Sequence, residues 1–296
     1  IFMKKYALYL VLSICFTSCF HKDIAVGPAM DFSIFENTPV APLAKEIYNN
    51  NNSKLNNLLA TGSFRHIINY QEQKYGNTLL MLAVFSQKKY AVKLLLQYGA
   101  DPNLFNDSIR NRGENAVIIA SESSTAEILE LLLKNGGNPN SCYCGKEQDN
   151  LGDLYSIRYS ALIEASKDNL SKVKLLIEYG ADINYYDVNN PITALQAALI
   201  QEKMDIVLFL LKCGADYTIP YIVTNVDGTK DYYDICYLLR CCVFPLKSDK
   251  FNLKQKVIQF LQEQGVNYNK SQIPEKIKIS VRDKYPDTWE YYLKHY

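Results

Sequence analysis

Histidine and tryptophan are scarce in this sequence, and their scarcity removes several classes of chemistry. The 296 residues include 3 histidines and 1 tryptophan. The histidines, His21, His66 and His295, lack the spacing of a metal-ligand pair and offer poor positions for a Ser–His–Asp site. The glycine-rich loops that bind phosphates are missing, as are the paired C-x₂-C knuckles of zinc sites. We therefore expect no catalytic residue, no metal site and no cofactor.

An excess of either charge is missing as well. The chain has 32 basic and 31 acidic side chains, whereas a protein that binds nucleic acid usually carries a basic excess. Hydrophobic residues make up 48% of the chain, which is ordinary for a folded protein and argues against disorder throughout. We therefore expect a folded chain that has no nucleic-acid partner.

The first 19 residues have the features of a secretory signal. Lys4 and Lys5 follow Met3, a short apolar run comes next, and small residues precede Cys19. The run is much shorter than the roughly 20 apolar residues that span a bilayer. The ending FTSC resembles a bacterial lipobox, although Phe16 stands where leucine is usual. This resemblance implies an acylated Cys19 that anchors the protein to a membrane, and an ordinary cleaved signal peptide is the alternative.

The residue after the lipobox cysteine bears on location. Phe20 stands in place of the aspartate that favours inner-membrane retention in some bacteria, so we expect an outer-membrane anchor facing the periplasm. The choice between the two membranes stays open. Export would place the cysteines in an oxidising compartment, and a bridge from Cys213 to Cys236 or Cys241 is sterically conceivable. Disulfides and buried free thiols both stay open for Cys142, Cys144, Cys213, Cys236, Cys241 and Cys242.

Five variants of one phrase indicate that the chain is built from a repeated unit. Between Thr78 and Asn103 the apolar residues form two short stripes, which predict a pair of antiparallel helices. Gly99 ends the second helix, because glycine readily adopts the left-handed conformation found there. The copies are LLLQYGADPN (94–103), LLLKNGGNPN (131–140), LLIEYGADIN (175–184), LLKCGADYT (210–218) and FLQEQGVNYN (260–269).

A second motif opens each helix pair, and together the two motifs resemble ankyrin repeats. Parts of the family pattern G-x-T-P-L-H-x-A recur as GNTLLMLA (76–83), GENAVIIA (113–120), YSALIEA (159–165) and ITALQAA (192–198). The resemblance covers about Ala41–Asn269. It implies an all-α fold, an ankyrin-repeat solenoid of about six helix-pair units with long inter-repeat loops.

The family's histidine is missing from every copy. Met81, Ile118, Ile163 and Gln196 stand in its place. In the family this histidine ties neighbouring loops together by a hydrogen bond, so we expect a degenerate and less rigid array. The fourth unit is also one residue shorter between its two motifs, and we place the missing residue in the turn at 167–169.

The irregular spacing of the copies places extra residues in connecting loops, which tolerate insertions. The insertions are Asn106–Arg112, Ser141–Tyr159 and Val243–Asn252. Helices of the first and last units are predicted near 42–49, 53–60, 232–242 and 253–264. The predicted domains are a signal peptide with lipobox (1–19), a tether (20–40), an ankyrin-repeat array (41–270) and a C-terminal capping segment (271–296).

The resemblance implies a binding surface on the concave side, made of loop tips and the edges of the first helices. Phe85, Ile119 and Ile200 would be exposed apolar residues there, and the alternative is that the insertions cover some of them. Tyrosine is also abundant at 23 residues, and tyrosine is enriched in binding hot spots, although packing between loops or biased composition also explains the excess. The predicted partner-binding residues are Leu82, Phe85, Ser86, Ile119, Glu122, Ser123, Glu164, Lys167, Ala197, Ile200, Gln201, Tyr185 and Tyr186.

These observations predict a non-enzymatic protein–protein interaction module tethered to a bacterial envelope membrane. We expect a monomer that binds a protein partner through its concave surface. The sequence does not name the partner, and it does not choose between an envelope scaffold and an immunity protein that neutralises a toxin. The alternative is an envelope enzyme with its site in the long insertions, near Asp149–Asp153 and Tyr155.

Overall fold

The structure is a computed structural model of the chain, and it describes residues 30–107, 112–148, 154–156, 158–188, 191–225 and 228–296. Two compact subdomains are distinguished. The N-terminal subdomain comprises the described residues of 30–165 and 171–190, and the C-terminal subdomain those of 166–170 and 191–296. Each is described by itself. The predicted signal peptide, the acylated Cys19 and the first part of the tether lie outside the described residues.

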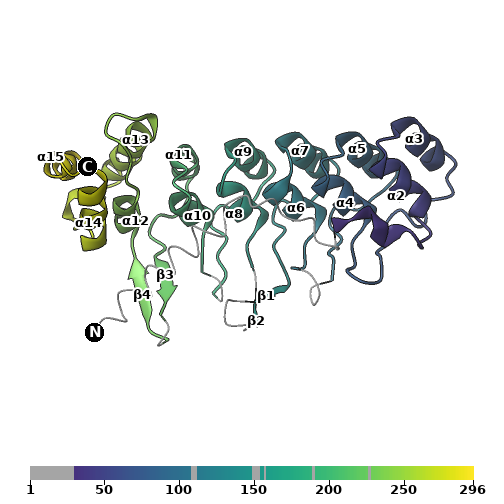
Figure 1. Ribbon diagram of the computed structural model, residues 1–296, viewed down its shortest axis with the longest axis horizontal. Helices are drawn as coiled ribbons and strands as arrows, with labels where there is room; N and C mark the ends of the chain where they lie inside the picture. The colour runs from purple at the N-terminus through teal and green to yellow at the C-terminus, as the bar shows by residue number, and fades with distance from the viewer. Residues whose placement is uncertain (1–29, 108–111, 149–153, 157, 189–190, 226–227) are drawn as a thin grey trace. The chain divides into compact units, whose positions relative to one another are not determined.

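The fold is all-α and consists of successive helix pairs (Figure 1). Up to residue 178 the elements are η2 (Phe32–Phe35), α2 (Ala41–Tyr48), α3 (Asn52–Ala60), α4 (Leu79–Phe85), α5 (Lys89–Gln97), α6 (Ala116–Ser123), α7 (Ala126–Lys134), β1 (Lys146–Gln148), β2 (Leu154–Ser156), α8 (Ala161–Ser166) and α9 (Leu170–Glu178). After residue 190 they are α10 (Ala194–Ile200), α11 (Met204–Lys212), β3 (Tyr221–Thr224), β4 (Lys230–Tyr233), α12 (Ile235–Cys241), α13 (Asp249–Glu263), η3 (Tyr268–Lys270), α14 (Glu275–Lys284) and α15 (Trp289–His295).

The repeat containing α4 and α5 shows why this sequence folds into helix pairs. The Thr78 hydroxyl accepts a hydrogen bond from the main-chain N–H of Met81 at 3.2 Å and so caps the start of α4. The second helix, α5, is amphipathic and buries Val92 and Leu95. Gly99 follows it with φ at 93°, a left-handed conformation that glycine adopts without a Cβ clash. The predicted helix pair is confirmed.

A recurring asparagine links the loop of one repeat to the loop of the next in the N-terminal subdomain. The Asn103 side chain donates to the Gly136 carbonyl at 2.9 Å and accepts from the Asn138 N–H at 2.8 Å. Asn69 and Asn140 make the same pair of contacts with the repeats that follow them. We call this series the asparagine ladder. It ties neighbouring loops together although the family's histidine is missing.

The expected loss of a hydrogen bond at the histidine position is wrong for Gln196. Its side-chain amide donates to the Ile219 carbonyl in the following loop at 2.9 Å, and its Oε1 accepts from the Thr193 N–H at 3.1 Å. Glutamine therefore ties α10 to the next loop, because its amide group reaches the same kind of acceptor. Met81 and Ile118, by contrast, are buried apolar side chains.

Three local predictions need correction, and one of them is the helix predicted near 253–264, because α13 begins at Asp249, within the insertion predicted at Val243–Asn252. The fourth repeat loses its residue from the first helix and not from the turn, because α8 has 6 residues where α4 has 7, and residues 167–169 match the turn at 86–88. The helix predicted near 232–242 begins only at Ile235, because residues 230–233 form β4 and pair with β3. The helices predicted near 42–49 and 53–60 are confirmed as α2 and α3.

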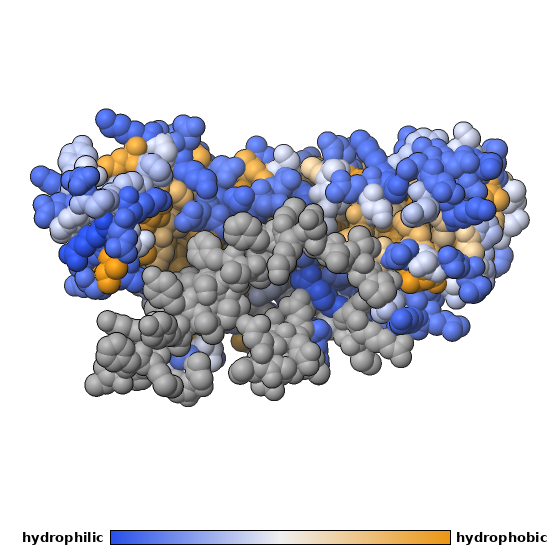
Figure 2. All heavy atoms as spheres, in the orientation of Figure 1, coloured by the Kyte–Doolittle hydropathy of each residue, from blue (hydrophilic) through white to orange (hydrophobic). Residues whose placement is uncertain are grey.

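Folded structure begins before the array boundary predicted at residue 41. Residues 32–35 form η2, and the side chains of Phe35 and Val40 are fully buried. At the other end, the segment predicted as a cap forms α14 and α15, whose buried residues include Val281 and Tyr292. On the face shown in Figure 2 the described residues are mostly hydrophilic, with apolar residues in smaller areas.

Candidate protein-binding surface

The structure buries four of the residues that the sequence assigned to the concave surface. Leu82, Ile119, Glu164 and Ala197 are each at most 3% exposed. The prediction of an exposed Ile119 is therefore wrong. The reason is that α6 is buried along its first six residues, with the insertions on either side contacting it. The remaining predicted residues are half-buried: Phe85, Ser86, Glu122, Ser123, Lys167, Ile200, Gln201, Tyr185 and Tyr186.

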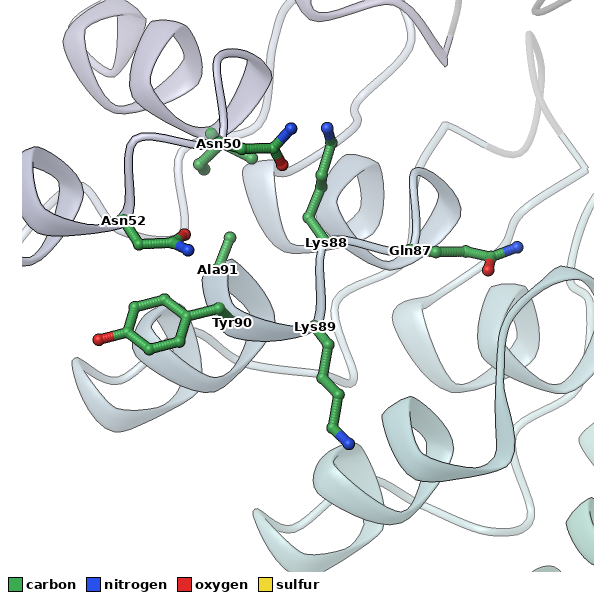
Figure 3. Close-up of a pocket in the computed structure, with 8 residues that line it drawn as sticks. Asn50, Asn52, Gln87, Lys88, Lys89, Tyr90 and Ala91 are labelled. Carbon is green, nitrogen blue, oxygen red and sulfur yellow. The ribbon is translucent and has the colours of Figure 1, made fainter.

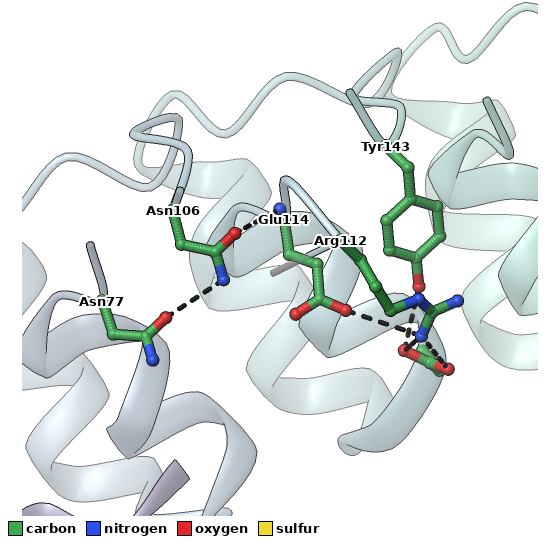
Figure 4. Close-up of polar contacts among 6 residues, drawn as sticks. Asn77, Asn106, Arg112, Glu114 and Tyr143 are labelled. Atoms are coloured by element: carbon green, nitrogen blue, oxygen red, sulfur yellow. Dashed lines mark hydrogen bonds and ion pairs between the residues drawn. The ribbon is translucent and has the colours of Figure 1, made fainter. Parts of the chain in front are cut away.

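Both insertions meet at the end of α6 through a set of polar side chains. We call Arg112, Glu114, Glu122 and Tyr143 the Arg112 cluster (Figure 4). Arg112 donates from Nη1 to both carboxylate oxygens of Glu122, at 2.9 and 3.2 Å. The Tyr143 hydroxyl donates to Glu122 Oε2 at 2.9 Å, and the Arg112 guanidinium lies 4.3 Å from the centre of the Tyr143 ring. Glu122 thus accepts hydrogen bonds from both insertions.

Tyr143 is the buried anchor of the longer insertion. Its side chain is fully buried and packs against Ile118 of α6. Burial raises the pKa of the Tyr143 hydroxyl well above its usual value, and the nearby carboxylates of Glu164 and Glu122 raise it further. The phenol therefore keeps its proton and acts as a donor to Glu122. Because its side chain is fully buried, Tyr143 is not available to a partner in this conformation.

Main-chain hydrogen bonds hold the two insertions together beside the cluster. The N–H of Cys144 donates to the Gly113 carbonyl at 3.1 Å, and the N–H of Gly145 donates to the Arg112 carbonyl at 2.9 Å. Gly113 has φ at 66°, and a Cβ at this position would lie 2.6 Å from the Cys144 sulfur. The close approach of the insertions therefore requires glycine at 113.

Glu114 extends the cluster toward the preceding repeat. Its N–H donates to Asn106 Oδ1 at 2.7 Å, and the Asn106 amide donates to Asn77 Oδ1 at 3.0 Å (Figure 4). Burial raises the pKa of the Glu114 carboxyl to about 7, with the nearby Glu122 carboxylate raising it further and Arg112, 3.6 Å away, opposing the shift. The cluster thus holds a carboxyl that titrates near neutral pH.

The side chains of Arg112 and Glu122 are 29% and 33% exposed, so the cluster reaches the surface. It presents a fixed guanidinium–carboxylate pair, and charged groups of this kind form strong hydrogen bonds. Sequence reasoning selected Glu122 but missed Arg112 and Glu114 as its neighbours. The available signal was the position of Arg112 at the end of one insertion and of Tyr143 at the start of the other.

Two pockets are lined by residues outside the Arg112 cluster. A pocket of about 150 Å³ lies at the turns before α3 and α5 and is lined by Asn50, Asn52, Lys88 and Tyr90 among others (Figure 3). A second, of about 380 Å³, lies beside Tyr217 and Phe260 in the C-terminal subdomain. None of the predicted binding residues lines either pocket. In the part of the chain that the structure describes, no group of three or more His, Cys, Asp or Glu residues could hold a metal ion.

All six cysteines among the described residues are free thiols. The bridge conceivable from Cys213 to Cys236 or Cys241 is not formed. Cys242 is buried and its thiol contacts the carbonyls of Leu199 and Leu238, at 3.6 and 3.4 Å. These thiols act as small buried groups or lie at the surface.

Comparison with known families agrees with this architecture. The family of ankyrin repeats, in three copies, matches residues 43–143, from α2 to Tyr143. No curated protein matches the chain. The fold is thus an all-α repeat solenoid that contains ankyrin repeats, and ankyrin repeats indicate a protein–protein interaction module. Among the helices of the described residues, none has both the length and the apolar composition needed to cross a bilayer.

Proposed function

We propose that this protein is a non-enzymatic binding module. It binds a protein partner on the side of its repeats formed by the first helix of each pair, and the Arg112 cluster is the centre of this surface. The observation that carries the proposal is the guanidinium–carboxylate pair of Arg112 and Glu122, held in place by buried Tyr143 and still partly exposed. Fixed charged groups of this kind give specificity and pay little ordering entropy on binding. Half-buried Phe85 and Ser123 would supply contacts around the pair.

We further propose that the chain is exported and acylated at Cys19, and that it acts as a monomer at the outer membrane facing the periplasm. The support is the lipobox-like FTSC ending and the short charged and apolar segment before it. Within this proposal the partner is either a component of the envelope or a toxin that the protein neutralises. An enzyme with its site in the insertions remains the competing proposal, although residues 149–153 and the Tyr155 side chain lie outside the described part.

The test is a pull-down of the membrane-extracted protein followed by mass spectrometry, with three variants in parallel. Glu122→Gln removes the charge at the centre of the surface, and we expect it to lose at least about tenfold in partner recovery. Glu127→Gln on α7 is the matched control, because this carboxylate is exposed and is not part of the Arg112 cluster. Cys19→Ala should release the protein from the membrane fraction without changing the partner.

The outcomes separate the two parts of the proposal. One dominant partner that is lost only in Glu122→Gln supports the surface, and a secreted toxin as that partner supports the immunity role. Equal recovery by all three variants would overturn the Arg112 cluster as the binding centre. A Cys19→Ala protein that stays in the membrane fraction would overturn the anchor. A hydrolytic activity of the purified protein would favour the enzyme instead.

A further inference from the structure

The joint between the last two repeats lacks a rung of the asparagine ladder. In each rung an asparagine donates to the carbonyl of the first residue of the next glycine turn and accepts from the N–H of its third residue. Counted from the glycine, Thr218 in the turn after α11 stands at the position of Asn103 and Asn140. The Thr218 hydroxyl donates to Asp216 Oδ1 at 2.6 Å. Thr218 therefore bonds within its own turn, where an asparagine would reach the next one.

The turn after α13 nevertheless begins with the geometry of the turns that receive an asparagine. Gly265 has φ at 86°, and Gly136, which receives Asn103, has φ at 87°. In both turns the second residue donates its N–H to the carbonyl five residues earlier at 2.9 Å. These bonds fix the course of the main chain past the helix end. The carbonyl of Gly265 and the N–H of Asn267 are therefore the counterparts of the two groups that bind Asn103.

We call the Gly265 carbonyl and the Asn267 N–H the open joint. Within the described residues, neither group forms a hydrogen bond with another group of the protein. Both residues are exposed, and so are Gly136 and Asn138, which nevertheless bind Asn103 through the same two main-chain groups. Exposure therefore does not prevent such a contact. The open joint offers one acceptor and one donor, side by side, to a group from outside.

The second pocket, of about 380 Å³, lies beside the open joint. Helices α11 and α13 pack side by side (Figure 1), and the pocket lies between the turn after α11 and the end of α13. Its lining includes Thr218 and Gln264, the residue before Gly265. Apolar side chains and one aromatic ring line the rest of it, from Leu211, Ala215, Tyr217 and Phe260. A ligand bound at the open joint would therefore find apolar contacts next to it.

A carboxamide is the group that matches the open joint. Its NH₂ donates and its oxygen accepts from one planar group, as Asn103 does at 2.9 and 2.8 Å. A carboxylate lacks the donor and would bring its charge against the Gly265 carbonyl, and an amine lacks the acceptor. In a trans peptide bond the N–H and C=O point in opposite directions, so a main-chain amide does not present both to the joint.

We propose that the open joint and the pocket beside it bind an asparagine side chain of a partner polypeptide, with an apolar side chain of the partner in the pocket. The occupant is inferred from the three asparagines of this chain that bind the equivalent groups of other turns. The partner's asparagine would fill the place that Thr218 leaves open and would add a rung from outside. This site lies in the last two repeats, is separate from the Arg112 cluster and does not depend on it.

A substitution that fills the joint from within the chain tests its chemistry. Thr218→Asn places the ladder's own residue at this position, and hydrogen exchange at the Asn267 N–H of the full-length protein, followed by NMR, should slow at least about fivefold. Thr218→Ser is the matched control, because serine carries no carboxamide, and exchange should stay within about twofold of the native rate. Unchanged exchange in Thr218→Asn would show that the joint does not accept a carboxamide and would overturn the proposal.

Fluorescence polarisation with the full-length protein tests the ligand. The probe is a short labelled peptide with a central Asn-Phe pair, compared with peptides that carry Asp or Leu in place of the asparagine. The Asn peptide should bind at least about fivefold more tightly, because Asp lacks the donor and Leu lacks both groups. Thr218→Asn should abolish this binding by occupying the joint, whereas Thr218→Ser and Glu122→Gln should retain it.

The results that would overturn the site are equally specific. They are equal binding by the native protein and Thr218→Asn, equal binding of the Asn and Leu peptides, and no binding of the Asn peptide. Loss of binding in Glu122→Gln alone would overturn it too, because the peptide would then bind at the Arg112 cluster.

Discussion

Tyr143 shows how one side chain organises a surface that it does not itself expose. It comes from the longer insertion, is buried against Ile118 of α6, and donates its hydroxyl to Glu122. Because the carboxylate also accepts from Arg112, the two insertions share one acceptor. The geometry of the partly exposed pair is therefore fixed by a residue that is itself buried.

Removing only the Tyr143 hydroxyl tests this arrangement. We expect Tyr143→Phe to lower the free energy of unfolding by about 1–2 kcal/mol, because a hydrogen bond to a carboxylate is lost while the ring stays buried. Urea denaturation measures the change. Tyr90→Phe is the control, since that ring is 49% exposed on α5, and it should change stability by less than about 0.5 kcal/mol. A Tyr143→Phe protein as stable as this control would contradict the role of the hydroxyl.

A rung of the asparagine ladder is the second feature that single residues can test. Asn103→Ala removes both contacts to the following loop, and we expect a loss of about 1–2 kcal/mol together with faster hydrogen exchange at the Asn138 N–H. Asn135→Ala serves as the comparison, because the Asn135 side chain donates to the Leu131 carbonyl of its own helix pair and not to a neighbouring loop among the described residues. If both substitutions cost the same and Asn138 exchange is unchanged, the ladder does not stabilise the junction.

At the scale of elements, helices and hairpins differed in how far the sequence predicted them. Helix pairs were predicted because two short apolar stripes lie between Thr78 and Asn103 and because terminal glycines such as Gly99 mark where the second helix ends. The β3–β4 hairpin was missed and its second strand was placed in a helix, because tyrosines at 232 and 233 suit either element. The turn dipeptide Asp227–Gly228 was a usable hairpin signal, and Asp234, which caps α12, marks where the helix starts.

The contact between the two insertions can be tested with a pair of glycines. Gly113 and Gly99 are both left-handed, but a Cβ at 113 would meet Cys144 and Gly145, whereas a Cβ at 99 would meet nothing within 4 Å. We expect Gly99→Ala to cost about 1 kcal/mol from backbone strain alone, and Gly113→Ala to cost about 3 kcal/mol because a clash is added. Thermal or urea unfolding measures both. Equal costs would mean that the insertions separate easily.

At the scale of the whole molecule, two shifted pKa values affect stability in different pH ranges. Burial raises the pKa of Glu114 and lowers that of Lys254, in each case to about 7. The pKa of Glu114 is raised from 4.5 to about 7, so the folded state favours the protonated acid. This contribution is fully present below the unfolded pKa and is lost as pH rises through about 7. The contribution from Lys254 changes only above about pH 7. The two groups also lie in different subdomains.

Glu114→Gln should therefore flatten the pH profile of stability on the acid side. Between about pH 5 and about pH 7.5 we expect the native protein to lose about 1–3 kcal/mol relative to the variant, since glutamine keeps the neutral form at every pH. Urea denaturation at the two pH values measures it. Glu130→Gln, at a partly exposed carboxylate of α7, is the control and should follow the native profile. Parallel profiles for the native protein and Glu114→Gln would contradict the raised pKa.

The candidate site was less predictable than the fold for a physical reason. Helix periods and turn residues are local and can be read along the chain, so the repeats followed from the sequence. The Arg112 cluster depends on how two insertions fold over α6, and spacing does not determine such long-range packing. Ile119 illustrates this, because its place on the first helix was predicted, whereas the sequence left open whether it was exposed or covered, and it is buried. The domain boundaries and the Cys19 anchor stay predictions.

The asparagine ladder has a consequence for how such a chain can change in length. Asn69, Asn103 and Asn140 each carry the connector for the next module, and each module offers the same docking carbonyl and N–H at its own glycine turn. A module bounded by these joints is interchangeable in its connections, so a duplicated copy inserted between two others would meet compatible ends on both sides. Gene duplication within the array could thus lengthen the protein without redesign of any junction.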